Sequence, residues 1–311
     1  MVLVGQLQRC GGTLLVQLFD GHSQIYTHPP ELYWGKPEKW NWPNFDVRGD
    51  TSPRHYYYLL YQAWVTNRAA KRSLDLGKVS APQRFPFNFN VGIHRKTFFY
   101  LSHKACVSTR RDVLNCYLKA FYSAWLDYEN STGRKKFHVA FIPRISMHQD
   151  SVERFFEDYP DGFLVHMFRH PAAWWASARK HHKQYEKIGS LKLWEASTKS
   201  GIKMKTKYGK RVICVSFEGL VTDTKMSMRN ICRYLGLEWE DTLLRPTFNS
   251  IPVSANTSFD KKPPGSVSLD VVEIYNKYLA PKEIVEINRE YLPLYLKASD
   301  YCVNKQSDSS S

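Results

Sequence analysis

Apolar residues gather along the chain in short blocks, and each block is followed by a stretch with helical spacing. Blocks long enough for one buried strand lie at residues 2–7, 137–142, 163–168 and 211–217. Apolar positions that recur every three or four residues predict helices at residues 12–21, 110–128, 148–158, 172–187 and 228–235. Strands that alternate with helices predict an α/β fold of three layers, in which a mostly parallel central sheet is flanked by helices.

The chain between these blocks has weaker patterns. A loop with several prolines and glycines is predicted for residues 23–53, and its aromatic residues are Trp34, Trp40, Trp42 and Phe45. Their ring faces suit the wall of a ligand site, and a hydrophobic cluster under a long loop is the alternative interpretation. Helical spacing from Tyr57 to Val65 predicts one further helix, and residues 269–296 are expected to form a helical pair.

The turn after the first strand is the most informative segment of the sequence. A strand, a glycine turn and a helix N-terminus direct bare backbone N–H groups at an anion. Arg9 adds a full positive charge there, and Thr13 adds a hydroxyl group in the first helical turn. We therefore predict a phosphate or sulfate site, with a plain structural turn as the alternative. The residues assigned to it are Arg9, Cys10, Gly11, Gly12, Thr13 and Leu14.

A second segment has the same design. The apolar block at residues 163–168 ends at Arg169, Pro171 suits the first turn of the next helix, and Ser177 follows eight positions after the arginine. An arginine and a serine near the carboxyl end of a strand lie where open α/β sheets bind ligands. Two anion-binding turns in one chain suggest a ligand with separated phosphate groups.

The motifs together resemble those of sulfotransferases that use 3′-phosphoadenosine 5′-phosphosulfate (PAPS). The segment Arg9-Cys-Gly-Gly-Thr-Leu-Leu resembles the family's 5′-phosphosulfate loop, and Arg169-His-Pro with Ser177 resembles its 3′-phosphate motif. Later segments resemble other family motifs in the right order, and they are Val215–Leu220, Tyr234–Leu237, Pro246–Asn249 and Asn256–Phe259. The matches cover residues 1–35 and 137–265, whereas residues 36–136 match no motif.

The resemblance, to bacterial-type and glycan sulfotransferases, implies a P-loop-like fold and a donor site for PAPS, with adenosine 3′,5′-bisphosphate (PAP) as the product and no metal. Cys10, His170 and Phe217 stand where other residue types are usual in the family. Besides the residues of the two turns, the resemblance assigns donor binding to a further set. This set consists of Phe217, Ser258, Phe259, Lys261, Lys262 and Gly265.

The implied chemistry is transfer of a sulfuryl group by in-line displacement to a hydroxyl or amine acceptor. By analogy with phosphoryl transfer, the enzyme must neutralise the donor oxygens and remove the acceptor proton. Arg9 serves the first task. The resemblance to glycan sulfotransferases places a catalytic glutamate at Glu31, and His28 is the second candidate because an imidazole has the better unperturbed pKa. The alternative for Glu31 is an exposed loop carboxylate.

Two other classes of protein remain as alternatives. A nucleotide-dependent kinase or phosphotransferase needs Gly-Lys-Ser/Thr at the end of its phosphate loop, and here Gly12 occupies the lysine position before Thr13. A non-catalytic polyanion-binding protein could keep the same fold. The presence of Arg9, Ser177 and Glu31 argues against that alternative.

Charge and composition limit the kinds of molecule that the protein is expected to bind. The formal net charge is +15, and basic residues crowd at 179–187 and 199–211. A positive surface attracts anions, so we expect a small-molecule, lipid or glycan acceptor, and contact with anionic surfaces is compatible with it. Nucleic-acid binding is not expected, because the second basic run has few interleaved aromatic residues.

Length and cysteine usage set the expected organisation. With 311 residues and a 43% hydrophobic fraction, we expect a single domain over residues 1–302. Within it, residues 36–136 form a helical and aromatic insertion on the acceptor side, and residues 303–311 form a disordered tail. The six cysteines show no metal-binding spacing, and no apolar run suits a membrane span or a secretory signal. We therefore expect a cytoplasmic protein.

Overall fold

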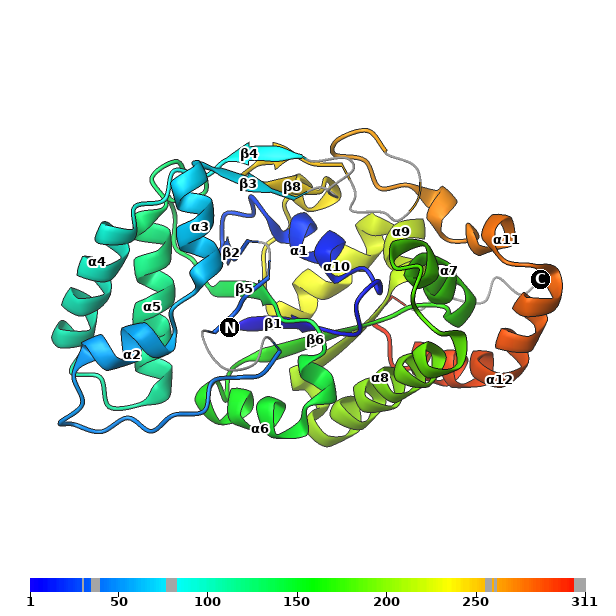
Figure 1. Ribbon diagram of the computed structural model, residues 1–311, viewed down its shortest axis with the longest axis horizontal. Coiled ribbons are helices and arrows are strands. Elements are labelled where there is room, and N and C mark those ends of the chain that lie inside the picture. The colour runs from blue at the N-terminus through cyan, green and yellow to red at the C-terminus, as the bar shows by residue number, and fades with distance from the viewer. Residues whose placement is uncertain (30, 35–39, 77–82, 255–258, 260–261, 305–311) are drawn as a thin grey trace.

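A parallel five-stranded sheet forms the centre of the molecule (Figure 1). The computed structural model describes residues 1–29, 31–34, 40–76, 83–254, 259 and 262–304. The strands lie in the order β2-β5-β1-β6-β7, and every neighbouring pair is parallel. They are β1 (Val2–Gly5), β2 (Ile25–Thr27), β5 (Phe137–Phe141), β6 (Phe163–Phe168) and β7 (Val212–Ser216). The predicted α/β fold with a parallel central sheet is confirmed.

Helices cover both faces of this sheet. Figure 1 shows α1 and α10 on one side of the strands and α6 and α8 on the other. The helices around the sheet are α1 (Gly12–Phe19), α6 (Gln149–Asp158), α7 (Pro171–His181), α8 (Lys187–Tyr208), α9 (Phe217–Thr222), α10 (Thr224–Leu235) and α12 (Pro281–Ser299). The short α11 (Tyr275–Tyr278) precedes α12, and a small hairpin pairs β8 (Thr247–Phe248) with β9 (Ile251–Pro252).

The strand order creates a crevice at the carboxyl edge of the sheet. From β1 the chain runs through α1 to β2 on one side, whereas β6 pairs with the other side of β1. Open α/β sheets bind ligands at such a point, because the connections on either side diverge and leave the strand ends open. The ends of β1, β5 and β6 therefore frame the candidate site.

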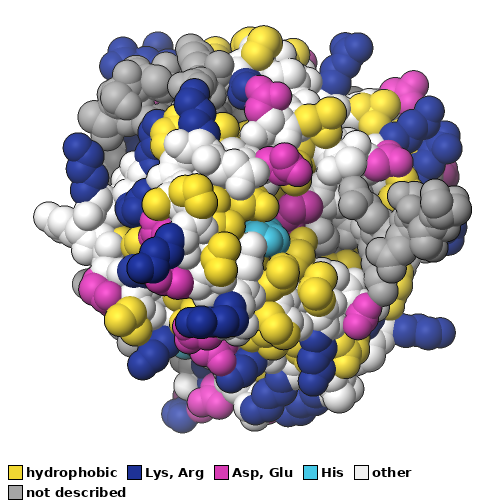
Figure 2. Space-filling model, turned by 90° about the vertical axis from the view of Figure 1, so that its right-hand side faces the viewer, with side chains coloured by type: hydrophobic (Ala, Val, Ile, Leu, Met, Phe, Trp, Pro, Cys, Tyr) yellow, Lys and Arg dark blue, Asp and Glu magenta, His cyan; other side chains and the backbone are white. Residues whose placement is uncertain are grey.

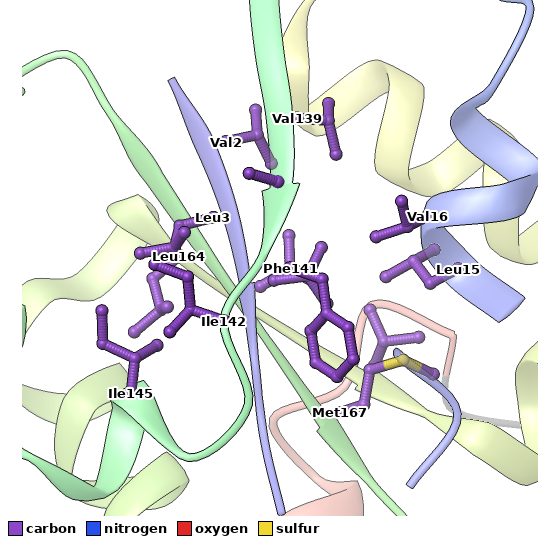
Figure 3. Packing of buried hydrophobic residues seen from close by; sticks show 14 of the residues in the cluster. Val2, Leu3, Leu15, Val16, Val139, Phe141, Ile142, Ile145, Leu164 and Met167 are labelled. Atoms are coloured by element: carbon purple, nitrogen blue, oxygen red, sulfur yellow. The ribbon is translucent and has the colours of Figure 1, made fainter. Parts of the chain in front are cut away.

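Alternating side chains of the central strands fill two separate core layers (Figure 3). Leu3 and Leu164 point to one side of the sheet with Ile142, while Phe141 and Met167 point to the other side, towards α1. Leu3, Leu164 and Ile142 have no exposed surface. Each fully buried side chain of this size contributes about 1.5–3 kcal/mol of transfer free energy, so the sheet is a rigid support for the loops at its edge.

The longest helix of the structure, α8, was not predicted from the sequence. Its buried face includes Ser197, Thr198 and Gly201 beside Leu191 and Trp194, so small and polar residues interrupt the apolar stripe. At Gly201 a Cβ atom would lie 2.4 Å from Cδ2 of His166, which shows how closely the helix approaches β6. Periodicity therefore missed α8, and the helix predicted at residues 172–187 ends earlier, at His181.

The region between β2 and β5 is helical, with differences from the prediction. It contains α2 (Pro53–Leu59), α3 (Ala63–Lys71), α4 (Val91–Lys104) and α5 (Arg110–Ala124), together with a hairpin of β3 (Ser73–Asp75) and β4 (Arg84–Pro86). The predicted helix from Tyr57 to Val65 is broken, because Gln62 is extended and begins a new helix. The apolar spacing continues across this break and so could not reveal it. Neither α4 nor the hairpin was predicted.

The C-terminal segment adds to the edge of the sheet. Val303 N donates to Cys214 O at 2.9 Å, and the side chain of Asn304 bonds both the N–H and the carbonyl of Ser216. The described chain is thus packed through Asn304, which corrects the prediction of a tail that begins at residue 303. Residues 305–311 of that predicted tail lie outside the described residues. Among the helices described, none combines the length and apolar character needed to cross a membrane.

Candidate active site

A pocket of about 220 Å³ opens at the carboxyl ends of β1 and β6. The glycine turn lines it with Arg9, Gly11, Gly12, Thr13 and Leu14, as the sequence led us to expect. The second turn contributes Arg169 and Ser177, and the remaining predicted residues at its walls are Glu31, Phe217, Phe259 and Lys262. Residues from six separate parts of the described sequence, β5 among them, therefore meet in one cavity.

The glycine turn has a backbone that few residue types can adopt. Gly11 has a φ of +101° and immediately precedes α1, and a Cβ atom at this position would lie 2.3 Å from Cδ2 of Phe217. Two separate factors therefore exclude a side chain at Gly11: the positive φ and the closeness of the Phe217 ring. The turn exposes the N-terminus of α1 towards the pocket, where the helix dipole favours negative charge.

Hydrogen bonds tie the two predicted anion-binding turns together. Arg9 Nε donates to Ser177 Oγ at 3.2 Å, across 168 residues of sequence. Arg169 Nη1 donates to the carbonyl of Arg9 at 2.8 Å, and its guanidinium lies 4.3 Å from the ring centroid of Phe217. The two arginines are thus positioned as one unit rather than as independent surface charges.

The pocket has an excess of positive charge. Arg169 is only 5% exposed, and burial lowers the pKa of its guanidinium. Burial, and then the charge of Arg169, lower the pKa of Arg9 to about 10. Both groups remain charged at neutral pH. Arg169 Nε is buried and has no hydrogen-bond partner in the structure. Buried cations of this kind require an anion, so the pocket fits a ligand with negatively charged oxygens.

Two tryptophans hold the arginine-bearing turns in place. Trp174 Nε1 donates to the carbonyl of Gln8 at 2.8 Å, and Trp194 Nε1 donates to the carbonyl of Arg169 at 3.0 Å. Both indoles come from helices that follow β6, and each satisfies a carbonyl next to a functional residue. Sequence analysis missed this support, because nothing in the local pattern around Trp174 or Trp194 shows which carbonyl it reaches.

Glu31 reaches the pocket because its segment runs along β5. Leu32 N donates to Phe141 O and His28 N donates to Val139 O, each at 2.8 Å, so the chain continues the direction of β2 beyond its last residue. The carboxylate accepts a hydrogen bond at Oε2 from the hydroxyl group of Tyr33. Glu31 is therefore held at the wall of the pocket that the glycine turn also lines.

His28, the second candidate for the catalytic base, is located elsewhere. Its ring is 1% exposed and packs 4.8 Å from Phe121 and 5.9 Å from Trp64, measured between ring centroids. Burial lowers its pKa to about 3, so the imidazole is neutral and difficult to protonate. It does not line the pocket, because the extended segment turns its side chain towards α5. The structure thus separates the two candidate bases.

The other assigned donor-binding residues differ in their positions. Cys10 is 3% exposed, and burial raises the pKa of its thiol to about 12, so this position offers only its backbone. Gly265 has a φ of +75°, lies in a turn and donates its N–H to Val253 O at 2.8 Å, and it is not among the residues that line the pocket. Ser258 and Lys261 lie outside the described residues.

Several pocket residues were not identified from the sequence. Gln6 and Gln8 line the cavity where the chain leaves β1, and His181 lines it near the end of α7. His181 stands four residues after Ser177, which places both on one face of the helix, and this spacing could have indicated it.

The aromatic loop does not form the wall that one interpretation of the sequence placed there. Trp42 is 1% exposed and donates from Nε1 to Asp158 Oδ2 at 2.7 Å, and Trp34 packs against it. Neither indole lines the pocket. Both belong to the hydrophobic core, as the alternative interpretation held. In the part of the chain that the structure describes, no cluster of His, Cys, Asp or Glu suits a metal ion.

Comparison with known structures supports the fold. The chain is similar to the sulfotransferase domain from the Synechococcus PCC 7002 olefin synthase, with a TM-score of 0.53, 16% identity and coverage of 96% of this chain and 93% of that one. The sulfotransferase domain from the curacin biosynthetic pathway gives a TM-score of 0.52 and 15% identity, with coverage of 94% and 97%. No curated protein sequence gives a significant match.

Comparison with family models identifies the chain at the level of sequence. The model of the sulfotransferase family matches residues 2–241, which include both anion-binding turns and the segment of Glu31. The match covers well over half of the 311 residues. The chain therefore belongs to the sulfotransferase family.

Proposed function

We propose that this protein transfers a sulfuryl group from PAPS to a hydroxyl or amine group of an acceptor. One observation carries the proposal: Arg9 and Arg169, two partly or fully buried cations, converge with the N-terminus of α1 on a single pocket. A ligand with two separated anionic groups would compensate this charge.

The residues present fit such a donor. Arg9 and the backbone N–H groups of residues 11–13 would hold the 5′-phosphosulfate, since the turn leaves no side chain at Gly11 to obstruct it. Arg169 and Ser177 would hold the 3′-phosphate. The ring faces of Phe217 and Phe259, which also line the pocket, would contact the adenine base.

The chain's own groups can perform both parts of the displacement. The bound donor supplies a sulfuryl group joined through an oxygen atom to its 5′-phosphate. Glu31 accepts the proton of the acceptor O–H or N–H as the new bond to sulfur forms. Arg9 and the turn's N–H groups stabilise the phosphate oxygen, which takes the electron pair of the broken S–O bond. No metal is needed for these steps.

The hydrogen bond from Tyr33 orients the proposed base. The hydroxyl group of Tyr33 donates to Oε2 of Glu31, which fixes the orientation of the carboxylate that would take the proton. The position of Glu31, on a wall formed by β5 rather than by the glycine turn, leaves the space between them for the reacting groups.

Ligand-induced stabilisation tests the choice of donor. We expect PAP, at concentrations well above its Kd, to raise the melting temperature in the absence of magnesium. ATP without magnesium should raise it much less, because it lacks the 3′-phosphate that Arg169 would bind. Equal stabilisation by magnesium-ATP would favour the kinase alternative. Stabilisation by PAP without transfer to any acceptor in a broad screen would favour a binding protein.

A further inference from the structure

Arg144 occupies a strained and well-defined position just beyond β5. Its φ is +63°, which is unusual for a residue with a side chain. Its N–H donates to the carbonyl of Gln6 at 2.8 Å, and its carbonyl accepts from Met147 N at 2.8 Å. The backbone is therefore fixed against the chain that leaves β1, at the same edge of the sheet as the pocket.

The side chain of Arg144 is fixed as well. Its Nε donates to Gln8 Oε1 at 2.7 Å, and its guanidinium carbon lies 4.5 Å from the ring centroid of Trp40. A guanidinium that rests on an indole and is held by one nitrogen still has its two terminal amino groups to offer. Such a group is arranged in advance to bind a planar or tetrahedral oxyanion.

No acidic side chain in the described part of the chain forms an ion pair with Arg144. Other half-buried arginines differ: Arg110 pairs with Asp158 at 2.7 Å, and Arg179 pairs with Glu283 at 3.4 Å. Arg144 is half-buried, and burial lowers the pKa of its guanidinium. A half-buried cation without a carboxylate is costly, which points to an anion supplied from outside.

The location of Arg144 separates this anion from the donor. Gln8, which bonds the guanidinium, lines the pocket, and so does Phe141, three residues before Arg144. The proposed donor groups already have partners in Arg9, Arg169 and Ser177. Arg144 is not among the residues that line the pocket, and it is joined to the pocket wall through Gln8. Its free amino groups are thus available to a second ligand.

We propose that Arg144 binds an anionic oxygen group, a carboxylate or a sulfate, that is part of the acceptor. The acceptor is then an anionic molecule whose reacting hydroxyl or amine group lies towards Glu31. This inference rests on the proposed sulfuryl transfer, and it adds the substrate class. The two terminal amino groups of Arg144 donate to the oxyanion, while Trp40 supports the guanidinium from its face.

The surrounding surface agrees with an anionic acceptor. The connection between α7 and α8 is exposed. Lys183 in this connection takes part in none of the described ion pairs, in contrast to Lys187, which pairs with Glu286 at 3.2 Å. Figure 2 shows Lys and Arg side chains, with Asp and Glu among them, over the lower part of this side of the molecule. The formal net charge of +15 attracts anionic acceptors.

Matched pairs of ligands test the inference on the intact chain. The probes are hydroxyl compounds with aryl, sugar and aliphatic skeletons, each as the carboxylic acid, as the sulfate ester and as the neutral amide. Their equilibrium binding to the protein saturated with PAP is measured by nuclear magnetic resonance. For at least one skeleton we expect an anionic form to bind at least about tenfold more tightly than the amide, as a charge-assisted hydrogen bond allows.

Substitution assigns the preference to the residue. Arg144→Gln should abolish the preference for the anionic form while the Kd for PAP stays within about twofold of wild type. Arg229→Gln is the matched control, because Arg229 also stacks on a tryptophan, 5.0 Å from the ring centroid of Trp239, but belongs to a different pocket. It should retain the preference.

Three results would overturn the inference. They are no preference for any anionic form, a preference that survives Arg144→Gln, and a large loss of PAP affinity in that variant, which would assign Arg144 to the donor. Failure of the protein to bind PAP would instead refute the proposed function itself. Binding of PAP without any preference for anions refutes only the inference about the acceptor.

Discussion

Burial has opposite consequences in two neighbouring regions of this molecule. In the pocket, Arg9 and Arg169 lose part of their hydration, yet the pKa of Arg9 remains about 10 and the charge persists. In the aromatic packing around α5, His28 experiences the same kind of burial, and its pKa of about 3 leaves the ring neutral. The difference arises from the starting values, since an arginine begins about six pH units above a histidine.

The pocket and the aromatic packing both lie beside the segment that contains His28 and Glu31, and this contrast explains why they differ in chemistry. The pocket keeps charges whose hydrogen bonds run to the backbone and to Ser177, so that it can bind an anion. The aromatic region keeps rings that contact one another at 4.3 to 6.2 Å between centroids, such as Tyr26 with Tyr122 and Phe121 with Trp125. Glu31 belongs to the first region, and His28, three residues earlier, belongs to the second.

The largest effect on activity is expected at Glu31, and it tests whether the pocket rather than the aromatic region supplies the catalytic base. Replacement Glu31→Gln keeps the shape and the hydrogen bond from Tyr33 but removes the base. Single-turnover sulfuryl transfer should fall by roughly 10²–10⁴-fold, while donor affinity stays near that of wild type. Glu157→Gln, at an exposed carboxylate that is 68% accessible, is the control and should remain active. Full activity of Glu31→Gln would remove the residue from the chemistry.

A smaller effect is expected at the 3′-phosphate site. Arg169→Ala removes a charge-assisted contact of about 1.5–3 kcal/mol, so the Kd for PAP should rise by roughly 10–150-fold. Ser177→Ala removes a neutral hydroxyl group and should weaken binding less. Isothermal titration calorimetry measures both constants. An unchanged Kd in Arg169→Ala would contradict the assignment of the 3′-phosphate to this residue.

The smallest effect on activity is expected at His28, where the change appears in stability. His28→Phe should alter turnover by no more than about threefold, because the ring lies outside the pocket. Its folded pKa of about 3 lies below the unfolded value near 6.5, so the unfolded chain binds more protons between these pH values. The stabilisation is complete above pH 6.5 and is lost as the pH falls towards 3.

Chemical denaturation at several pH values measures this linkage. Between pH 3 and 6.5 each such histidine adds up to about 1.4 kcal/mol per pH unit to the slope of the unfolding free energy against pH. This slope corresponds to one proton, and His28→Phe should remove it. The pKa values of the half-buried His138 and the buried His166 are also lowered to about 3, so these residues should continue to destabilise the variant in acid. A well-folded His28→Phe variant that has lost sulfuryl transfer would restore His28 as a candidate base.

The pattern of the sequence was a good guide wherever function depends on a local stretch of chain. The strand, turn and helix around Arg9 and the corresponding segment around Arg169 both appear at the predicted places. Their geometry follows from residues next to one another, such as Gly11 with its positive φ and Pro171 in the first turn of α7. The order of strands and helices was readable for the same reason.

The pattern failed where burial involves residues that do not look apolar. α8 was missed because Ser197, Thr198 and Gly201 occupy its buried face. The break between α2 and α3 was missed because apolar spacing continues across Gln62. Trp34 and Trp42 were ambiguous from sequence, since an indole suits a ligand wall and a core equally well, and only the bond from Trp42 to Asp158 distinguished the two.

By itself the sequence predicted two strand-turn-helix segments that carry arginines at the edge of an α/β sheet, because each turn is built from a few consecutive residues. Only the tertiary structure decided that they meet, since Arg9 and Ser177 are 168 residues apart and come together through the pairing of β1 with β6. It also decided between Glu31 and His28 as residues of the pocket, because alternate side chains of an extended segment point in different directions. The contact of Arg144 with Gln8, across 136 residues, has the same origin. A local motif depends on adjacent residues, whereas the contacts of a side chain depend on how strands that are distant in the sequence pack together.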